Sequence, residues 1–238
     1  MPGTYVYVDG FNFYYGALRH SKYKWLDYEA LSRSLLPQDH IEKIRYFTAK
    51  IKPLGPGDTG HERQHAYLRA VAANPLIETT FGTFRSQVKL RALADGSHSV
   101  RDLFRPHLRP VPLVRGILAE AKRRRLRHHT LARVIVQEEK GTDVSLGAFL
   151  VHDALTGQCS KALVLSNDSD LKEAVALAVK ASVPVGIVNP HYRQTPSREL
   201  TQAATFRIPF RPGVLAKCQL PNTVIGANGK QIHRPREW

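Results

Sequence analysis

The sequence predicts an α/β fold, with a mostly parallel central sheet that helices cover on both faces. Short apolar runs typical of buried strands alternate with segments of helical spacing. The first run, residues 4–9, is β-branched and aromatic, with no polar residue between Tyr5 and Val8. Strands that alternate with helices imply parallel pairing. A chain of 238 residues is long enough for one such domain with additional segments.

The first third of the chain follows this alternation after the strand at residues 4–9. We expect, in order, a helix from about residue 13, a helix from 27 or 28 to 36, a strand at 43–51, a helix from 58 or 59, and one or two strands at 76–90. The second helix should end before Pro37, because the residue before a proline resists helical dihedrals.

The alternation resumes after residue 131. We expect a strand at 133–138, a helix from 143 to about 155, a strand at 161–166, a helix at 169–181, a strand at 183–188, a short helix at 197–204 and a short strand at 205–208. Residues 212–238 are punctuated by Pro and Gly. The sequence therefore predicts a domain at 1–211 with a basic insertion at about 85–131, followed by a C-terminal tail at 212–238.

Charge is the unusual part of the composition. The chain has 35 Lys and Arg against 20 Asp and Glu, a net charge of +15 and a pI near 10.1, which suggests a phosphate-rich partner. Residues 85–131 hold twelve Lys or Arg and three acids, and 115–129 look helical. We expect contacts to the RNA backbone from Arg85, Lys122, Arg123, Arg124, Arg125 and Arg127. The alternative is a solvated basic helix face.

Cysteine content and apolar runs bear on location. Two cysteines, Cys159 and Cys218, form at most one disulfide, so a reducing compartment is the simpler interpretation. The N-terminus has no signal-peptide pattern, and no apolar run approaches the ~18 residues of a membrane span. We expect a cytoplasmic protein without membrane contact. Whether it forms a homo-oligomer or binds a protein partner stays open.

Acidic residues stand where strands end or helices begin. Asp9 closes the first strand, Asp168 and Asp170 follow the strand at 161–166, and Asp143 begins a helix. Ligands of open α/β sheets bind at the carboxyl ends of strands. Each acid alone is equally well a helix cap or a turn residue. Together they predict a site for Mg²⁺ or Mn²⁺, the ions that prefer carboxylate oxygens and that support phosphodiester hydrolysis.

Four further residues accompany these acids. We expect Asn12 to orient a ligand or a water, and Ser166 and Asn167 to support the site from behind. Asp153 lies ten residues after Asp143, about 80° away around the helix, so we expect an outer or structural acid.

Aromatic and histidine residues offer two other interpretations. Tyr14, Tyr15 and Trp25 either stack on bases or form the core and a groove wall. The pairs His61/His65 and His128/His129 suggest zinc, but no third ligand is evident and the metalloprotease pattern is missing, so we do not expect zinc.

Three blocks, VDGFN (8–12), EEKGTDVSL (138–146) and LSNDSDL (165–171), resemble the signature blocks of the NYN domain, a member of the PIN-like nuclease superfamily. The blocks are in the family's order, and the resemblance spans residues 4 to about 190. Asn167 stands where Gly is frequent in that family, and Asn also tolerates a tight turn. Nothing about the basic stretch carries over from the resemblance.

The resemblance implies a Rossmann-like three-layer α/β/α sandwich, PIN-like in type, with metal-dependent ribonuclease activity. Asp9 matches the family's first metal ligand, Asn12 its polar partner, Asp143 the middle acid, and Asp168 and Asp170 the last pair. The main hypothesis is an endoribonuclease that uses Mg²⁺ or Mn²⁺. The alternative is a non-catalytic RNA-binding module on the same fold. A Rossmann-type nucleotide binder is disfavoured, because a carboxylate stands where the glycine-rich turn would receive phosphate.

Overall fold

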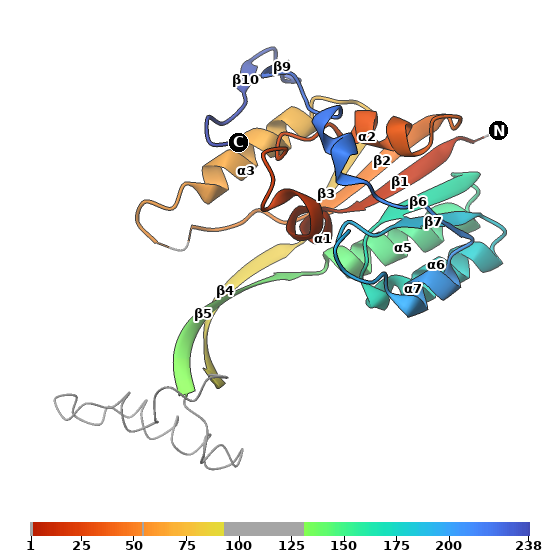
Figure 1. Ribbon diagram of the computed structural model, residues 1–238, viewed down its shortest axis with the longest axis horizontal. Helices are drawn as coiled ribbons and strands as arrows, with labels where there is room; N and C mark the ends of the chain where they lie inside the picture. The colour runs from red at the N-terminus through yellow and green to blue at the C-terminus, as the bar shows by residue number, and fades with distance from the viewer. Residues whose placement is uncertain (1, 54, 93–130) are drawn as a thin grey trace. The chain divides into compact units, whose positions relative to one another are not determined.

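The computed structural model describes residues 2–53, 55–92 and 131–238, which divide into two compact units (Figure 1). The larger unit is Met1–Phe84 with Glu139–Trp238, and the smaller is Arg85–Glu138. The helix expected at 115–129 lies outside the described residues. So do five of the expected RNA contacts, Lys122, Arg123, Arg124, Arg125 and Arg127.

A six-stranded sheet forms the centre of the larger unit, in the order β3-β2-β1-β6-β7-β8. The bounds are β1 Thr4–Asp9, β2 Ile41–Thr48, β3 Ile77–Phe81, β6 Lys161–Leu165, β7 Val185–Val188 and β8 Phe206–Arg207. All neighbouring pairs in it are parallel. The predicted α/β class with a mostly parallel central sheet is therefore confirmed.

Helices cover both faces of this sheet (Figure 1). One layer contains α5 (Thr142–Leu155), α6 (Lys172–Lys180) and α7 (Arg198–Ala203), and the other contains α2 (Tyr28–Leu35) and α3 (Gly60–Val71). Side chains of β1 alternate between the two layers as a strand requires. Val6 and Val8 pack in the core on the α2 and α3 side, whereas Tyr5 and Tyr7 pack against α5 and α6.

The helix after β1 begins earlier than the sequence predicted. Helix α1 is Gly10–Phe13, and a π-helical turn, η1, continues from Tyr14–Leu18, so the expected start at about Phe13 was late. Asp9, which could have been a turn residue, is the N-cap of this helix, because its side chain accepts a hydrogen bond from the Asn12 main-chain N–H. The chain therefore turns into a helix directly at the end of β1.

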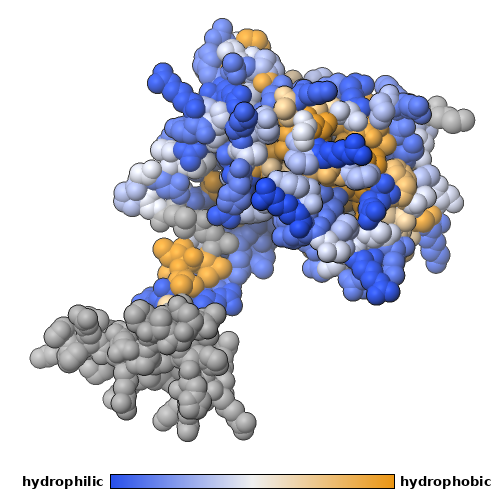
Figure 2. Space-filling model, in the orientation of Figure 1, coloured by the Kyte–Doolittle hydropathy of each residue, from blue (hydrophilic) through white to orange (hydrophobic). Residues whose placement is uncertain are grey.

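Residues 76–90 form two strands that belong to different sheets. Strand β3 lies at the edge of the six-stranded sheet, whereas β4 (Thr83–Ala92) pairs with β5 (Leu131–Lys140) in a separate two-stranded sheet. The strand expected at 133–138 therefore exists but stands outside the parallel sheet. In the smaller unit, Lys89 Nζ lies 2.6 Å from Glu138 Oε1 across this pair of strands. The face of the molecule in Figure 2 is mostly hydrophilic, with smaller apolar areas among the hydrophilic side chains.

The C-terminal residues are part of the larger unit. After the short 3₁₀ helix η3 (Pro212–Ala216), strands β9 (Thr223–Ile225) and β10 (Gln231–His233) pair antiparallel. Leu215, Cys218 and Ile232 are buried in the core with Trp25, whose indole N–H donates to the Pro221 carbonyl. None of the helices in the described part of the chain is long and apolar enough to cross a membrane.

Candidate metal centre

The centre of the sheet contains the point where the strand order reverses. From the neighbouring strands β1 and β6, the chain adds β2 and β3 on one side and β7 and β8 on the other. Ligands of open α/β sheets bind at the carboxyl ends of such a strand pair, because the connections there leave in opposite directions and open a crevice. Asp9 is the last residue of β1, and Asp168 follows the end of β6.

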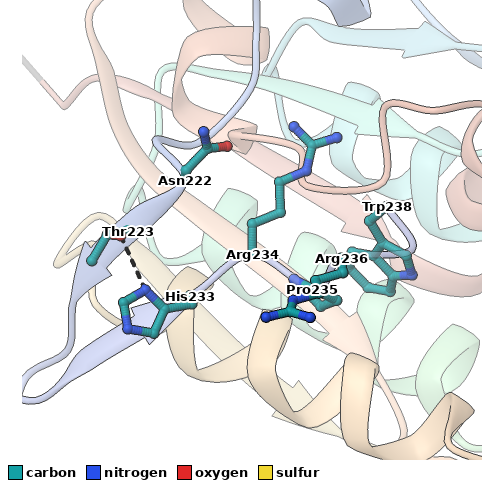
Figure 3. Close-up of a pocket in the computed structure, with 7 residues that line it drawn as sticks. All are labelled: Asn222, Thr223, His233, Arg234, Pro235, Arg236 and Trp238. Carbon is teal, nitrogen blue, oxygen red and sulfur yellow. Dashed lines mark hydrogen bonds between the residues drawn. The ribbon is translucent and has the colours of Figure 1, made fainter.

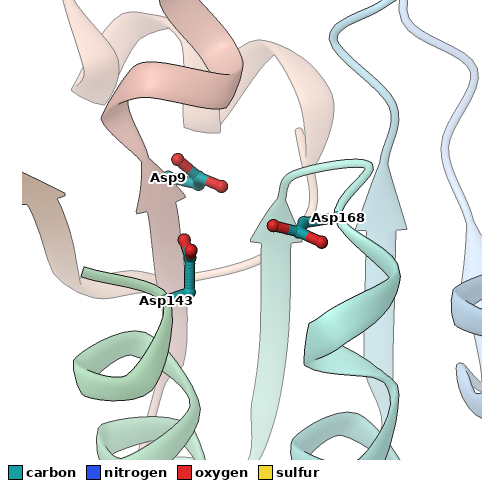
Figure 4. A group of neighbouring side chains, drawn as sticks. All are labelled: Asp9, Asp143 and Asp168. Atoms are coloured by element: carbon teal, nitrogen blue, oxygen red, sulfur yellow. The ribbon is translucent and has the colours of Figure 1, made fainter. Parts of the chain in front are cut away.

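Three aspartates converge at this point from three separate elements. Asp9, Asp143 and Asp168 each present a carboxylate oxygen, and these oxygens lie within 4.8 Å of one another (Figure 4). Asp143 reaches the group from the first turn of α5, and Asp168 from the loop that precedes the 3₁₀ helix η2 (Ser169–Leu171). The structure therefore brings together three of the four acids that the sequence selected as metal ligands.

Asp9 is the most enclosed of the three. Its exposed fraction is 3%. Its Oδ1 accepts a hydrogen bond of 2.9 Å from the Asn12 main-chain N–H, and its Oδ2 accepts one of 2.9 Å from the Ser166 hydroxyl. Burial outweighs these two bonds and, with the charges of Asp143 and Asp168, raises the pKa of Asp9 to about 7. A nearby cation would reverse this effect, because it favours the ionised form.

The residues expected to support the acids are linked to them by hydrogen bonds. Ser166 Oγ, besides donating to Asp9, accepts from the Asp168 main-chain N–H at 3.1 Å. The Asn12 side-chain oxygen accepts from the Asn167 main-chain N–H at 3.1 Å. Asn12 and Ser166 therefore fix the loop that carries Asp168 relative to the end of β1.

Asp143 stands at the first turn of α5, directly after a tight turn. Gly141 has a φ of 90°, a conformation that side chains rarely adopt, and Glu139 Oε1 caps the helix by accepting from the Thr142 main-chain N–H at 3.0 Å. Burial raises the pKa of Asp143 to about 6, and the charges of Asp168, Glu139 and Asp170 add to the effect. Sequence reasoning missed Glu139, although its place in the middle block, just before a helix start, was a signal.

Asp170 does not belong to the group of three. Its side chain is exposed, and its main-chain N–H donates to Asp168 Oδ1 at 3.0 Å. Its carboxylate contributes to the site through charge, by raising the pKa of Asp143.

Asp153 lies in a buried network of its own. Both of its oxygens accept from the Arg45 guanidinium, at 2.6 Å and 3.0 Å, and Oδ2 also accepts from the Tyr7 hydroxyl at 2.8 Å. The Arg45 guanidinium in turn lies over the Phe149 ring, 4.5 Å from its centroid. Asp153 thus joins α5 to β1 and β2 as a structural acid, and Arg45, its partner, was not selected from the sequence.

The donor atoms fit a hard divalent cation. All three come from carboxylates, and no His or Cys belongs to the group, as far as the described residues extend. Mg²⁺ and Mn²⁺ prefer such oxygen ligands, and a buried carboxylate beside two others gains most from a cation.

The other residues considered for nucleic-acid contact lie in different surroundings. Arg85 is exposed on β4, Tyr14 and Tyr15 line a groove, and Trp25 is buried in the core.

Comparison with known proteins adds one clear relationship. The chain is 31% identical to the 6-hydroxy-3-succinoylpyridine 3-monooxygenase HspA of Pseudomonas putida, over 99% of this chain and 75% of that protein. The chain belongs to the family of HspA. A search of protein-family models found no match, so the resemblance to the NYN domain stays a prediction. A solved structure of a Vibrio parahaemolyticus protein of unknown function has a TM-score of 0.48 and 14% identity, and covers 87% of this chain and 92% of its own.

Proposed function

We propose that this protein is a metal-dependent ribonuclease that cleaves internal phosphodiester bonds of RNA. The observation that carries the proposal is the convergence of Asp9, Asp143 and Asp168, with oxygens within 4.8 Å, at the strand-reversal point of the sheet. The net charge of +15 supports a polyanionic substrate, because a basic surface attracts phosphates from a distance.

Each residue of the site has a role in this proposal. Asp9, Asp143 and Asp168 would hold Mg²⁺ or Mn²⁺, and the exposed Asp170 would add negative charge beside them. The ion supplies Lewis-acid stabilisation of the phosphoryl oxygens and lowers the pKa of a bound water. Ser166 orients Asp9 through its hydroxyl, and Asn12 positions the Asp168 loop through the Asn167 main chain.

The test compares wild type with Asp168→Asn on a mixed RNA pool, with Mn²⁺ or with EDTA, analysed on a gel. Glu173→Gln is the matched control, because Glu173 is an exposed acid on α6. We expect wild type and Glu173→Gln to cleave RNA with Mn²⁺ but not with EDTA, and Asp168→Asn to cleave it in neither condition. Full activity of Asp168→Asn would contradict the proposal. Salt-sensitive RNA binding that survives EDTA, without any cleavage, would instead support the non-catalytic RNA-binding module.

Membership in the HspA family favours a second candidate, oxygenation of an aromatic small molecule. HspA is named for 3-monooxygenation of 6-hydroxy-3-succinoylpyridine, and the relationship extends over nearly the whole of this chain. Ring position 3 of that pyridine carries the succinoyl group and no hydrogen, so oxygenation there breaks the bond between C3 and the chain. The ring takes one oxygen of O₂ as a hydroxyl, and the chain leaves as the carboxylic acid with one NADH consumed, or as the aldehyde with water formed and two NADH consumed. Incubation of the protein with that pyridine, NADH and O₂, followed by mass spectrometry, discriminates the two. A dihydroxypyridine that has lost the succinoyl chain supports the second candidate, and an unchanged pyridine counts against it.

A further inference from the structure

A pocket of about 570 Å³ opens beside the end of β1, on the face of the sheet that α2 and α3 cover. Gly10 and Phe11, the two residues after Asp9, belong to its wall. Consecutive Cα atoms are about 3.8 Å apart, so the wall begins one peptide unit from a proposed metal ligand. None of the three clustered aspartates lines the pocket. The pocket is therefore a neighbour of the metal centre and a separate site.

Two helical faces contribute walls to this pocket. Residues three or four apart on a helix share a face, and both walls show this spacing. One wall comes from α1 and η1, through Phe11, Tyr14, Tyr15 and Leu18, and the other comes from α3, through Gly60, Arg63, Gln64 and Tyr67. The spacing shows that each of these walls is one face of a helix.

Aromatic rings dominate the lining. Tyr15 is 51% exposed, and its ring stacks with Phe11 at a centroid distance of 6.3 Å. Three of the lining tyrosines, Tyr28, Tyr46 and Tyr67, are buried. Their hydroxyls bond within the protein, because Tyr46 hydrogen-bonds with Tyr28 and Thr48, and Tyr67 donates to the Leu26 carbonyl at 2.8 Å. Such a surface stacks on the face of a planar ring.

Three cations stand around the same pocket, namely Arg19, Lys24 and Arg63. Within the described part of the chain, none of the three forms an ion pair with a carboxylate. Arg19 instead lies over the Tyr15 ring, 5.4 Å from its centroid, and Arg63 donates to the Thr59 hydroxyl at 2.6 Å. The lining contains two acids, Asp58 and Glu237. The cationic excess indicates that the ligand of this pocket has an anionic group.

We propose that this pocket binds a single nucleotide, with the base among the aromatic rings and the phosphate at Arg19, Lys24 and Arg63. A nucleoside monophosphate has a planar ring for the aromatic side chains and a phosphate with about two negative charges for the three cations, whereas a simple aromatic acid has a single negative charge. If the nucleotide belongs to an RNA strand, the inference rests on the proposed ribonuclease function: the pocket then selects the nucleotide beside the bond that is cut.

A second hollow, of about 510 Å³, lies beside β9 and β10 and shares Trp238 with the pocket (Figure 3). Its lining also contains Arg234 and Arg236 but no phenyl or phenol ring. It lacks the cluster of phenyl and phenol rings on which a base would stack, so the nucleotide is assigned to the first pocket.

The experiment titrates the intact protein with each of the four nucleoside 5′-monophosphates, in EDTA, and follows tryptophan fluorescence. Trp238 lines the pocket, so a bound base should quench its emission. We expect saturable binding that Tyr15→Ala and Arg19→Gln each weaken by about tenfold. The matched controls are Tyr192→Ala and Arg33→Gln, which remove a partly exposed tyrosine and an exposed arginine outside the pocket and should leave the affinity unchanged.

The outcomes separate the pocket from the metal centre. In EDTA the metal centre holds no cation and contributes nothing to nucleotide binding, so the Asp9→Asn variant should bind the monophosphates as wild type does. Nucleotide binding without any RNA cleavage would refute only the proposed ribonuclease function. Absence of binding, or binding that Tyr15→Ala and Arg19→Gln leave unchanged, would overturn the pocket assignment. Equal affinity for inorganic phosphate, or binding of pyridine-3-carboxylate in place of nucleotides, would overturn it too.

Discussion

Replacement of Asp9 by Asn should make the metal-free protein more stable at about pH 8. In the folded state the pKa of Asp9 is raised from 3.8 to about 7, chiefly by burial. Between these two values the folded chain holds a proton that the unfolded chain has released, so the free energy of unfolding falls as the pH rises. The difference corresponds to about 4 kcal/mol when Asp9 is fully ionised. An asparagine does not ionise, so the variant does not lose this free energy of unfolding as the pH rises.

The hydrogen bonds around position 9 survive the change. The Asn oxygen can still accept from the Asn12 N–H, and its NH₂ group can donate to the Ser166 hydroxyl, which donates to Asp9 Oδ2 in the wild type. Allowing about 1 kcal/mol for the altered bond, Asp9→Asn should gain about 3 kcal/mol over wild type in EDTA at about pH 8. At about pH 3, below both pKa values, Asp9 is mostly protonated in both states, so the gain should vanish.

Urea unfolding followed by tryptophan fluorescence, with EDTA or with Mn²⁺, measures these differences. Mn²⁺ at about 100 times its dissociation constant should stabilise the wild type by about 3 kcal/mol at about pH 8, and much less at about pH 5, because the proton competes with the ion. It should not stabilise Asp9→Asn, whereas the control Glu173→Gln should behave as wild type. Equal Mn²⁺ effects on wild type and Asp9→Asn, or identical pH profiles in EDTA, would refute the reasoning.

Three further substitutions test other parts of the structure. Asp153→Ala leaves the buried Arg45 guanidinium with the half-exposed Glu78 as its carboxylate partner, and should lower the free energy of unfolding by about 3 kcal/mol, measured by urea unfolding. Ser166→Ala removes a bond that stabilises ionised Asp9, so Mn²⁺ should bind about tenfold more weakly by calorimetry, while the fold persists; unchanged affinity would exclude this role. Gly10→Ala would place a Cβ 2.7 Å from the Phe47 carbonyl oxygen and should lower the melting temperature, and an unchanged value would show that the backbone shifts there without cost.

The sequence predicted the part of the site that depends on strand ends. Asp9 and Asp168 each follow an apolar run, and parallel strands present their carboxyl ends at one edge, so their proximity followed from the fold class. Asp170 shows the limit of this argument. Asp168 and Asp170 are separated by a single residue, yet the 3₁₀ turn that starts at Ser169 leaves only Asp168 among the three converging aspartates.

The features that the sequence did not predict depend on residues far apart in the chain. The Asp153–Arg45 ion pair joins α5 to β2, and neither residue has a local pattern that announces the other. Strand β5 has the apolar content of a sheet strand, but its pairing with β4 is decided by tertiary context. The pocket needs Trp238 beside Tyr67, whose rings lie 5.8 Å apart although the two residues are widely separated in sequence. Local periodicity contains no information on contacts between residues so far apart in the chain.

The pairing of β1 with β6 also has a consequence for how the protein folds. Asp9 and Ser166 meet across 157 residues of sequence, so their contact forms only after the chain between them has been ordered or looped out. A partly folded chain without β6 in place has one acid of the three at the end of β1. A divalent cation should therefore bind tightly only to completed molecules, and would slow unfolding far more than it speeds folding.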